Sequence, residues 1–195
     1  MTNYKNWLMS AFVFVAAAFA TVHGAAQAHQ NHQTEAAQTQ QQKDQSAALL
    51  QTVREATERF KDFHQAEAEG YHLAFGCVSG SDSGAMGMHF VNGDLVAKGE
   101  LDPKRPQIIL YEPTSDGKLK LTGADFLVDA AQWDAKKIGP PILMGQIFHY
   151  FEAPNRFGLN AFYTLHVWAW KENPNGAFVN WHPNVACQSF SGQTP

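Results

Sequence analysis

Residues 161–187, AFYTLHVWAWKENPNGAFVNWHPNVAC, decide the fold, because the first ten of them predict a strand that is buried on both faces. Side chains alternate between the two faces of a strand. One face carries Phe162, Thr164, His166, Trp168 and Trp170, and the other carries Tyr163, Leu165, Val167 and Ala169. Both sets are mainly apolar, which is typical of a strand covered on both sides. A buried histidine needs a hydrogen-bond partner or a ligand, so His166 is the first candidate for a functional residue.

Upstream of this strand, short apolar runs alternate with Gly, Pro, Asn and Asp, a pattern typical of strands and turns. We expect strands at residues 88–91, 107–112 and 118–128, of which the last two should pair as an antiparallel hairpin. A further apolar run covers residues 142–151. The small residues of 77–87 predict a loop.

One amphipathic helix is predicted over residues 46–68, where apolar side chains recur every three or four positions. A helix followed by about five strands without intervening helices predicts an α+β fold, with a curved antiparallel sheet around the helix. An open half-barrel and a small β-barrel both satisfy this pattern.

Residues 1–28 have the features of a secretory signal peptide: a basic residue at Lys5, a short apolar run and small residues up to Ala28. The apolar run is shorter than the about 20 residues that span a bilayer, and no later run is longer. After cleavage near Ala28 we therefore expect a periplasmic or secreted protein without an integral membrane segment.

The rest of the chain divides into three parts by composition. Residues 29–45 are rich in Gln and His and poor in bulky apolar side chains, which predicts a disordered spacer. Residues 46–190 are long enough for a single α+β domain, and residues 191–195 form a short tail.

The charge and the cysteine content restrict the possible binding partners and the cellular compartment. The chain has 14 Lys and Arg against 18 Asp and Glu, a formal net charge of −4, which argues against nucleic acid as a partner. Cys77 and Cys187 are its two cysteines. In an exported chain, such a distant pair favours a disulfide bond over a metal or catalytic pair.

Four titratable residues lie within apolar strand segments, namely His89, Glu112, His149 and His166. Burial of each is costly unless the group is paired or bound to a metal ion. Three imidazoles and one carboxylate form a common ligand set for Zn²⁺, Cu²⁺ or Fe²⁺. The inner face of a curved sheet can bring these side chains together, and its apolar walls suit a small-molecule pocket.

Each candidate also has a structural alternative. The histidines can bond backbone carbonyls in the core, and Glu112 can pair with Lys104 or Arg105. His182, in the segment WHPNVAC, is a reserve ligand. His29 would become the N-terminal residue after cleavage, and an N-terminal histidine can bind copper. The flexible polar segment that follows it would not hold such a site in a fixed geometry.

Three functions remain open. The leading hypothesis is an exported protein that binds a divalent transition metal or a small ligand in the concavity of its sheet, with metal-activated water or oxygen chemistry if it is an enzyme. The second is a non-enzymatic periplasmic binding or envelope-stress module without metal. The third is a metal-free small-molecule enzyme with His166 and Glu112 as an acid-base pair. The sequence leaves the oligomeric state open.

Four blocks carry a resemblance to other proteins: CVSGSDSGAMGMHFVN, LDPKRPQIILYEP, LTGADFLV and FYTLHVWAWKENPNGAFVNWHPNVAC. Together they cover roughly residues 71–187, and the chain resembles an uncharacterised family of exported bacterial proteins that shares them. The resemblance includes His89, Glu112, His166 and the pair Cys77 and Cys187. It implies no particular activity.

Overall fold

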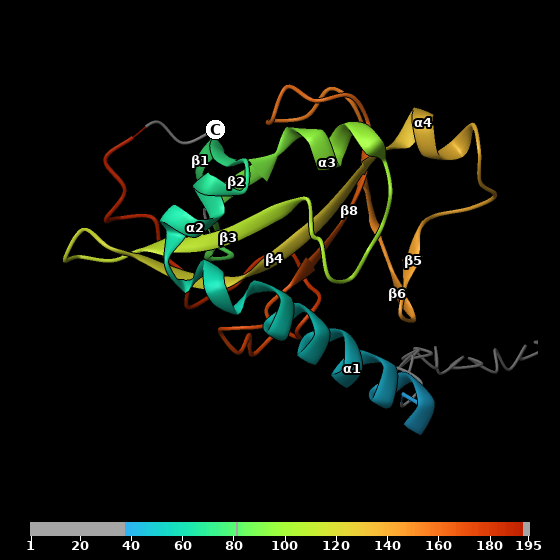
Figure 1. The fold of residues 1–195 in the computed structure, drawn as a ribbon, viewed down its shortest axis with the longest axis horizontal. Coiled ribbons are helices and arrows are strands. Elements are labelled where there is room, and N and C mark those ends of the chain that lie inside the picture. Colours follow the sequence, from blue (N-terminus) through green and yellow to red (C-terminus); the bar gives the residue numbers. More distant parts are fainter. Residues whose placement is uncertain (1–37, 81, 193–195) are drawn as a thin grey trace, which may run out of the picture. The chain divides into compact units, whose positions relative to one another are not determined.

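A six-stranded antiparallel sheet dominates the part of the chain that this computed structural model describes, residues 38–80 and 82–192 (Figure 1). The strand order is β1-β2-β3-β4-β8-β7, and β5 and β6 form a separate two-stranded sheet. The sheet is not closed into a barrel. The expected α+β fold is therefore confirmed in its open form, and the β-barrel alternative is wrong.

The strands are β1 (Tyr71–Ser79), β2 (Ala85–Asn92), β3 (Ile108–Pro113), β4 (Leu119–Asp129), β5 (Ile142–Leu143), β6 (Gln146–Ile147), β7 (His149–Phe151) and β8 (Phe162–Val167). The predicted hairpin is the antiparallel pair β3–β4. The sequence pattern missed β1, because its side chains alternate poorly between buried and exposed positions. The end of β1 and the start of β2 take up both ends of the loop predicted at residues 77–87.

The helices are α1 (Gln40–Thr57), η1 (Glu58–Lys61, a 3₁₀ turn), α2 (Phe63–Ala68), α3 (Gly93–Lys98) and α4 (Ala130–Asp134). Helix α1 begins before the predicted start at Ser46, because Thr39 and Gln42 form a reciprocal capping box. Residues 40–45 are therefore helical and not part of a spacer. The predicted signal peptide and most of the predicted spacer lie outside the described residues. Within the described part of the chain, no helix is long and apolar enough to cross a bilayer.

The predicted continuous helix up to residue 68 is interrupted at Asp62. Its side chain accepts a hydrogen bond from the backbone N–H of His64 and so begins α2. The 3₁₀ turn η1 between the two α-helices places Phe60 in the core, where its carbonyl accepts a hydrogen bond of 2.7 Å from the Tyr111 hydroxyl.

One face of the sheet packs against α1, η1 and α2. The main core cluster joins apolar side chains of these helices with those of the strands, including Leu49, Val53, Phe60, Phe90, Tyr111, Phe126 and Leu165. Trp170 adds a polar link, since its Nε1 donates to the Thr57 hydroxyl at 2.9 Å. This face is the principal hydrophobic core.

The opposite face carries a second, smaller cluster of Ile108, Leu110, Leu127 and Phe162. On β8, Leu165 and Val167 belong to the main core, whereas Phe162 belongs to the second cluster. The strand is therefore covered on both faces, as the sequence predicts. His166 alternates with Leu165 and Val167 and so lies on the face of the second cluster.

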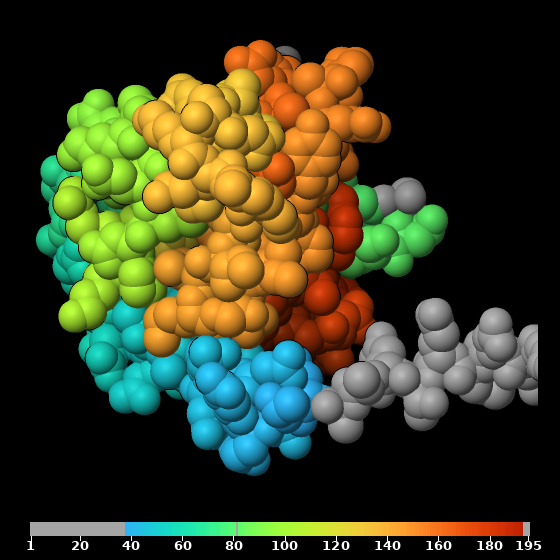
Figure 2. All heavy atoms as spheres, turned by 90° about the vertical axis from the view of Figure 1, so that its right-hand side faces the viewer, coloured from blue at the N-terminus to red at the C-terminus, as the bar shows by residue number. Residues whose placement is uncertain are grey.

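A long connecting segment, residues 130–161, separates β4 from its sheet neighbour β8. Figure 2 shows the segment from α4 to β7, coloured yellow to orange, lying above the first turns of α1 in blue. The β5–β6 hairpin is tied to the helix, because Gln146 Nε2 donates to the Ser46 hydroxyl at 2.9 Å.

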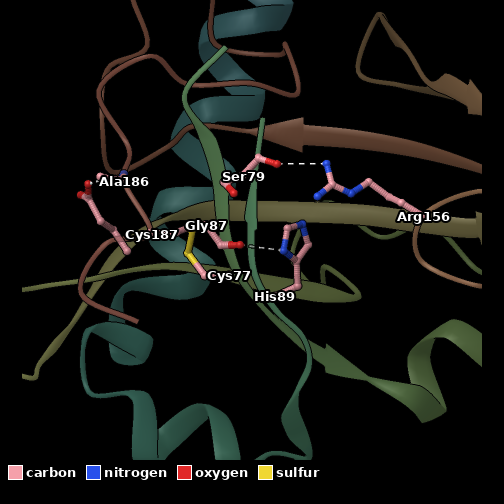
Figure 3. Close-up of a disulfide and its surroundings, with 8 residues drawn as sticks. Cys77, Ser79, Gly87, His89, Arg156, Ala186 and Cys187 are labelled. Atoms are coloured by element: carbon pink, nitrogen blue, oxygen red, sulfur yellow. Dashed lines mark hydrogen bonds between the residues drawn. A yellow bond between two sulfur atoms is a disulfide. The ribbon is translucent and has the colours of Figure 1, made fainter. Parts of the chain in front are cut away.

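The disulfide bond Cys77–Cys187 is present, with the two Cα atoms 5.7 Å apart. It joins β1 to the C-terminal segment beside Gly87 of β2 (Figure 3). A second link lies close in sequence, where Ala85 and His182 form an isolated antiparallel bridge. The C-terminal segment is thus fixed covalently and by hydrogen bonds to the start of the sheet.

Loss of this disulfide is expected to lower the free energy of unfolding substantially. The bond closes a separation of 110 residues, and the loop-entropy model gives about 4 to 5 kcal/mol for a loop of that size. We expect the double variant Cys77→Ala, Cys187→Ala to lose this free energy of unfolding, measured by urea unfolding, and its urea midpoint to fall accordingly. Wild-type protein unfolded in reductant is the matched control. Equal midpoints for oxidised and reduced wild type would contradict the prediction.

Candidate metal centre

Three side chains from three strands converge on the second face of the sheet: His89 of β2, Asp125 of β4 and His166 of β8. Each offers one ligand atom, and these atoms all lie within 4.8 Å of one another. The exposed fractions of the three residues are 3, 2 and 2%. The structure thus brings together two of the sequence-predicted ligands and adds an aspartate.

Strand register explains the convergence. Asp125 lies directly opposite His166 in the β4–β8 pair, so their side chains project to the same face. Ile108 of β3 faces Asp125, and Leu110 of the same strand faces His89 of β2. Because residues two apart on a strand share a face, the register places all three polar groups on one side.

The geometry suits a metal ion. His166 Nδ1 and Asp125 Oδ2 are 3.4 Å apart. Ligand atoms at about 2.1 Å from a tetrahedrally coordinated ion lie about 3.4 Å from each other. The ring centroids of His89 and His166 are 5.7 Å apart, which places the second imidazole beside the same point.

Hydrogen bonds orient two of the three ligands. His89 Nδ1 is 3.1 Å from the Gly87 carbonyl oxygen (Figure 3), and because a carbonyl only accepts, Nδ1 carries the proton. The lone pair on Nε2 is then available to a ligand. Asp125 Oδ1 accepts a hydrogen bond of 2.6 Å from the Thr164 hydroxyl, leaving Oδ2 for His166 or an ion. Such outer hydrogen bonds are usual around metal-binding histidines and carboxylates.

His166 has only weaker contacts: Asp125 Oδ2 lies 3.4 Å from its Nδ1, and the Asn180 side chain acts to raise its pKa, but neither forms a hydrogen bond of normal geometry. Both of its ring nitrogens are buried and form no hydrogen bond to the described residues. The same holds for Oδ1 of Asn180. A buried polar group without a partner costs about 1 to 3 kcal/mol. An ion bound at one ring nitrogen would supply the missing interaction.

Burial sets the protonation states. It lowers the pKa of His89 to about 4, with repulsion from His166 adding to the effect. It also lowers the pKa of His166 to about 3, again with a contribution from a second histidine, His149. The pKa of Asp125 is raised to about 6 by burial, against the opposing hydrogen bond from Thr164. At neutral pH the site therefore offers two neutral imidazoles and a carboxylate, the forms that bind metal ions.

Glu112 does not belong to this cluster. Its Oε2 pairs with Lys171 Nζ at 2.6 Å, and its Oε1 accepts a hydrogen bond from the backbone N–H of Ala186 at 3.2 Å. The partner is therefore Lys171 and not the expected Lys104 or Arg105. Glu112 holds the segment that carries Cys187 against β3.

His149 lies at the rim of the site. It faces Thr164 across the β7–β8 pair, so it projects to the same face, but its side chain is exposed. Its Nε2 lies 3.3 Å from the carbonyl oxygen of Phe178. The three-residue cluster does not include it.

The reserve ligand His182 is satisfied by the backbone. Its Nε2 bonds the Glu172 carbonyl at 3.0 Å, and its Nδ1 accepts the N–H of Asn184 at 3.0 Å. Both ring nitrogens are used, so His182 is a structural residue. His29 lies outside the described residues.

The sequence prediction missed Asp125. It stands in the segment LTGADFLV, an apolar strand, and so meets the same criterion that selected His89 and His166. The signal for a candidate was therefore present in the sequence, and strand register adds that the β4–β8 pairing places this carboxylate opposite His166.

Comparisons with protein-family models, curated proteins and solved structures found no match.

Replacement of His166 is expected to stabilise the metal-free protein. His166→Leu removes two buried unpaired nitrogens, so the free energy of unfolding in chelator should rise by about 1 to 3 kcal/mol. His89→Leu is the matched comparison. This variant should lower the free energy of unfolding, because the Gly87 carbonyl loses the hydrogen bond that His89 Nδ1 donates. Equal destabilisation of the metal-free protein by both variants, measured by urea unfolding, would show that His166 has a protein partner.

Proposed function

We propose that this chain is an exported protein that binds one divalent transition metal ion through His89, Asp125 and His166. The observation that carries the proposal is His166, a buried imidazole that faces a carboxylate at 3.4 Å and, with Asn180 beside it, still makes no hydrogen bond of normal geometry to the described residues. A purely structural core histidine is expected to use its ring nitrogens, as His182 does.

The donor set narrows the metal to a few ions. Two imidazole nitrogens and one carboxylate oxygen suit Zn²⁺, Fe²⁺ or Cu²⁺, and they disfavour Ca²⁺ and Mg²⁺, which prefer oxygen ligands. Three protein ligands also leave at least one coordination position for water or another small molecule, as in catalytic metal sites. Such an ion supplies Lewis acidity or redox chemistry when bound.

Export is supported by two independent features. The disulfide bond Cys77–Cys187 is of a type that persists in oxidising compartments outside the cytosol. Residues 1–28 have the composition of a secretory signal peptide. Both features support a periplasmic or extracellular location.

The metal-free acid-base pair of His166 and Glu112 has no support, since Glu112 is bound to Lys171 and the Ala186 backbone. A metal-free binding module remains the second candidate. Its support is that His89 bonds a backbone carbonyl, as a core histidine does.

Metal analysis tests the proposal directly. Protein loaded with Zn²⁺ or, without oxygen, Fe²⁺ and then dialysed should retain one ion per chain. Loading should also raise the stability, by about 2.7 kcal/mol at a free metal concentration of 100 times Kd. His166→Ala and Asp125→Asn should each weaken binding by more than about 100-fold, because outer-shell changes alone cost 10- to 100-fold.

Glu112→Gln and His149→Ala are the matched controls, since both alter sequence-predicted ligands that lie outside the cluster. Both should retain the ion. Metal-free wild type whose melting is unchanged by added metal would favour the binding module.

A further inference from the structure

A small apolar cavity adjoins the three proposed ligands. Its volume is about 20 Å³, and its polar lining consists of His89, Asp125, His166 and Thr164. A water molecule needs about 10 to 15 Å³ measured in this way. The cavity therefore has room for one very small molecule, and a bound ion would take part of that room.

Aromatic rings line the cavity and narrow its opening, which still reaches the surface. Phe157 lies at their centre, with ring centroids 5.5 Å from Phe75, 6.1 Å from Phe162 and 6.3 Å from Phe151. Phe151 and Phe162 stack on each other at 5.1 Å. Phe75 also meets the His89 ring edge to face at 6.2 Å, so the rings reach the proposed ligands directly.

The position of Phe157 is fixed by its loop. The side chain of Asn155 accepts hydrogen bonds from the backbone N–H groups of Phe157 and Leu159, both at 3.2 Å. The neighbouring Arg156 donates to the Ser79 carbonyl at 3.0 Å (Figure 3), which ties the loop to the end of β1. Phe157 is thus held over the cavity by contacts that do not involve the metal site.

A bulge in β1 places Phe75 opposite Phe157. The β1–β2 register shifts between Leu73 and Cys77, and Gly76 adopts a left-handed conformation with φ of 61°. Bulges of this kind redirect side chains. Here the bulge and the Asn155 loop supply the two facing rings of the cap.

Charge also limits what the cavity accepts. A divalent ion with two neutral imidazoles and one carboxylate carries a net charge of about +1. The surrounding walls are apolar, and an uncompensated charge there is unfavourable. A small monoanion removes that charge, whereas a neutral molecule leaves it in place, so charge favours an anion.

We infer that the metal ion, once bound as proposed above, takes as its external ligand a molecule of two or three atoms, and that Phe157 excludes larger ligands from the open coordination position. This inference rests on the proposed metal site. It identifies the ligand class by size: azide and nitric oxide belong to it, and imidazole does not. Within the class, charge favours azide.

The test uses Co²⁺-loaded protein, whose visible absorption bands report on the coordination sphere. Azide should change the spectrum of the wild type, whereas imidazole should have no effect at concentrations 100-fold above the azide midpoint. Phe157→Ala should admit imidazole, with a midpoint at least 10-fold below the highest imidazole concentration that leaves the wild-type spectrum unchanged. Tyr150→Ala is the control, because Tyr150 is exposed and does not line the cavity.

The outcomes separate the inference from the proposed function. Absence of bound Co²⁺ overturns both. Stoichiometric Co²⁺ with no response to azide overturns the ligand class alone, and equal responses of the wild type to azide and imidazole overturn the size limit. Phe157→Leu provides a milder second variant that keeps an apolar side chain in the cap, and it should admit imidazole more weakly than Phe157→Ala.

Discussion

The pairing of β4 with β8 is the constraint on which the rest of the structure depends. It places Asp125 directly opposite His166 in the middle of the sheet, where both side chains are buried. The same two strands send Phe126, Leu165 and Val167 into the main core on the other face. Because successive side chains point to opposite faces, the residues that pack under the helices also determine which face the polar groups occupy. A slip of the register by one residue would turn every one of these side chains to the wrong face.

The two faces of the sheet around this strand pair differ in their composition. Helices α1 and α2 and the turn η1 cover one face and bury its apolar side chains. The disulfide bond and the Glu112–Lys171 ion pair fix the C-terminal segment against the sheet. The second face keeps three buried polar groups beside an apolar cluster, an arrangement that is unfavourable for stability.

The polar groups of the second face differ in how well the protein satisfies them. Gly87 fixes the proton on His89, and Thr164 holds one oxygen of Asp125. His166 is left with unpaired nitrogens, so the cluster is oriented but incomplete. An ion would complete it, and the small aromatic cavity beside it would then control what else reaches that ion.

Local pattern determined much of the chain. The apolar spacing of Leu49, Val53 and Phe60 predicted the helical segment, and the alternation of Leu165, His166 and Val167 predicted a strand buried on both faces. The distant cysteines predicted the disulfide. Only the tertiary structure decided that Asp125 joins His89 and His166 while Glu112 pairs with Lys171, because strand order and register are long-range properties. A single strand reveals which of its residues are polar and buried, but its neighbours in the sheet decide which of these residues meet.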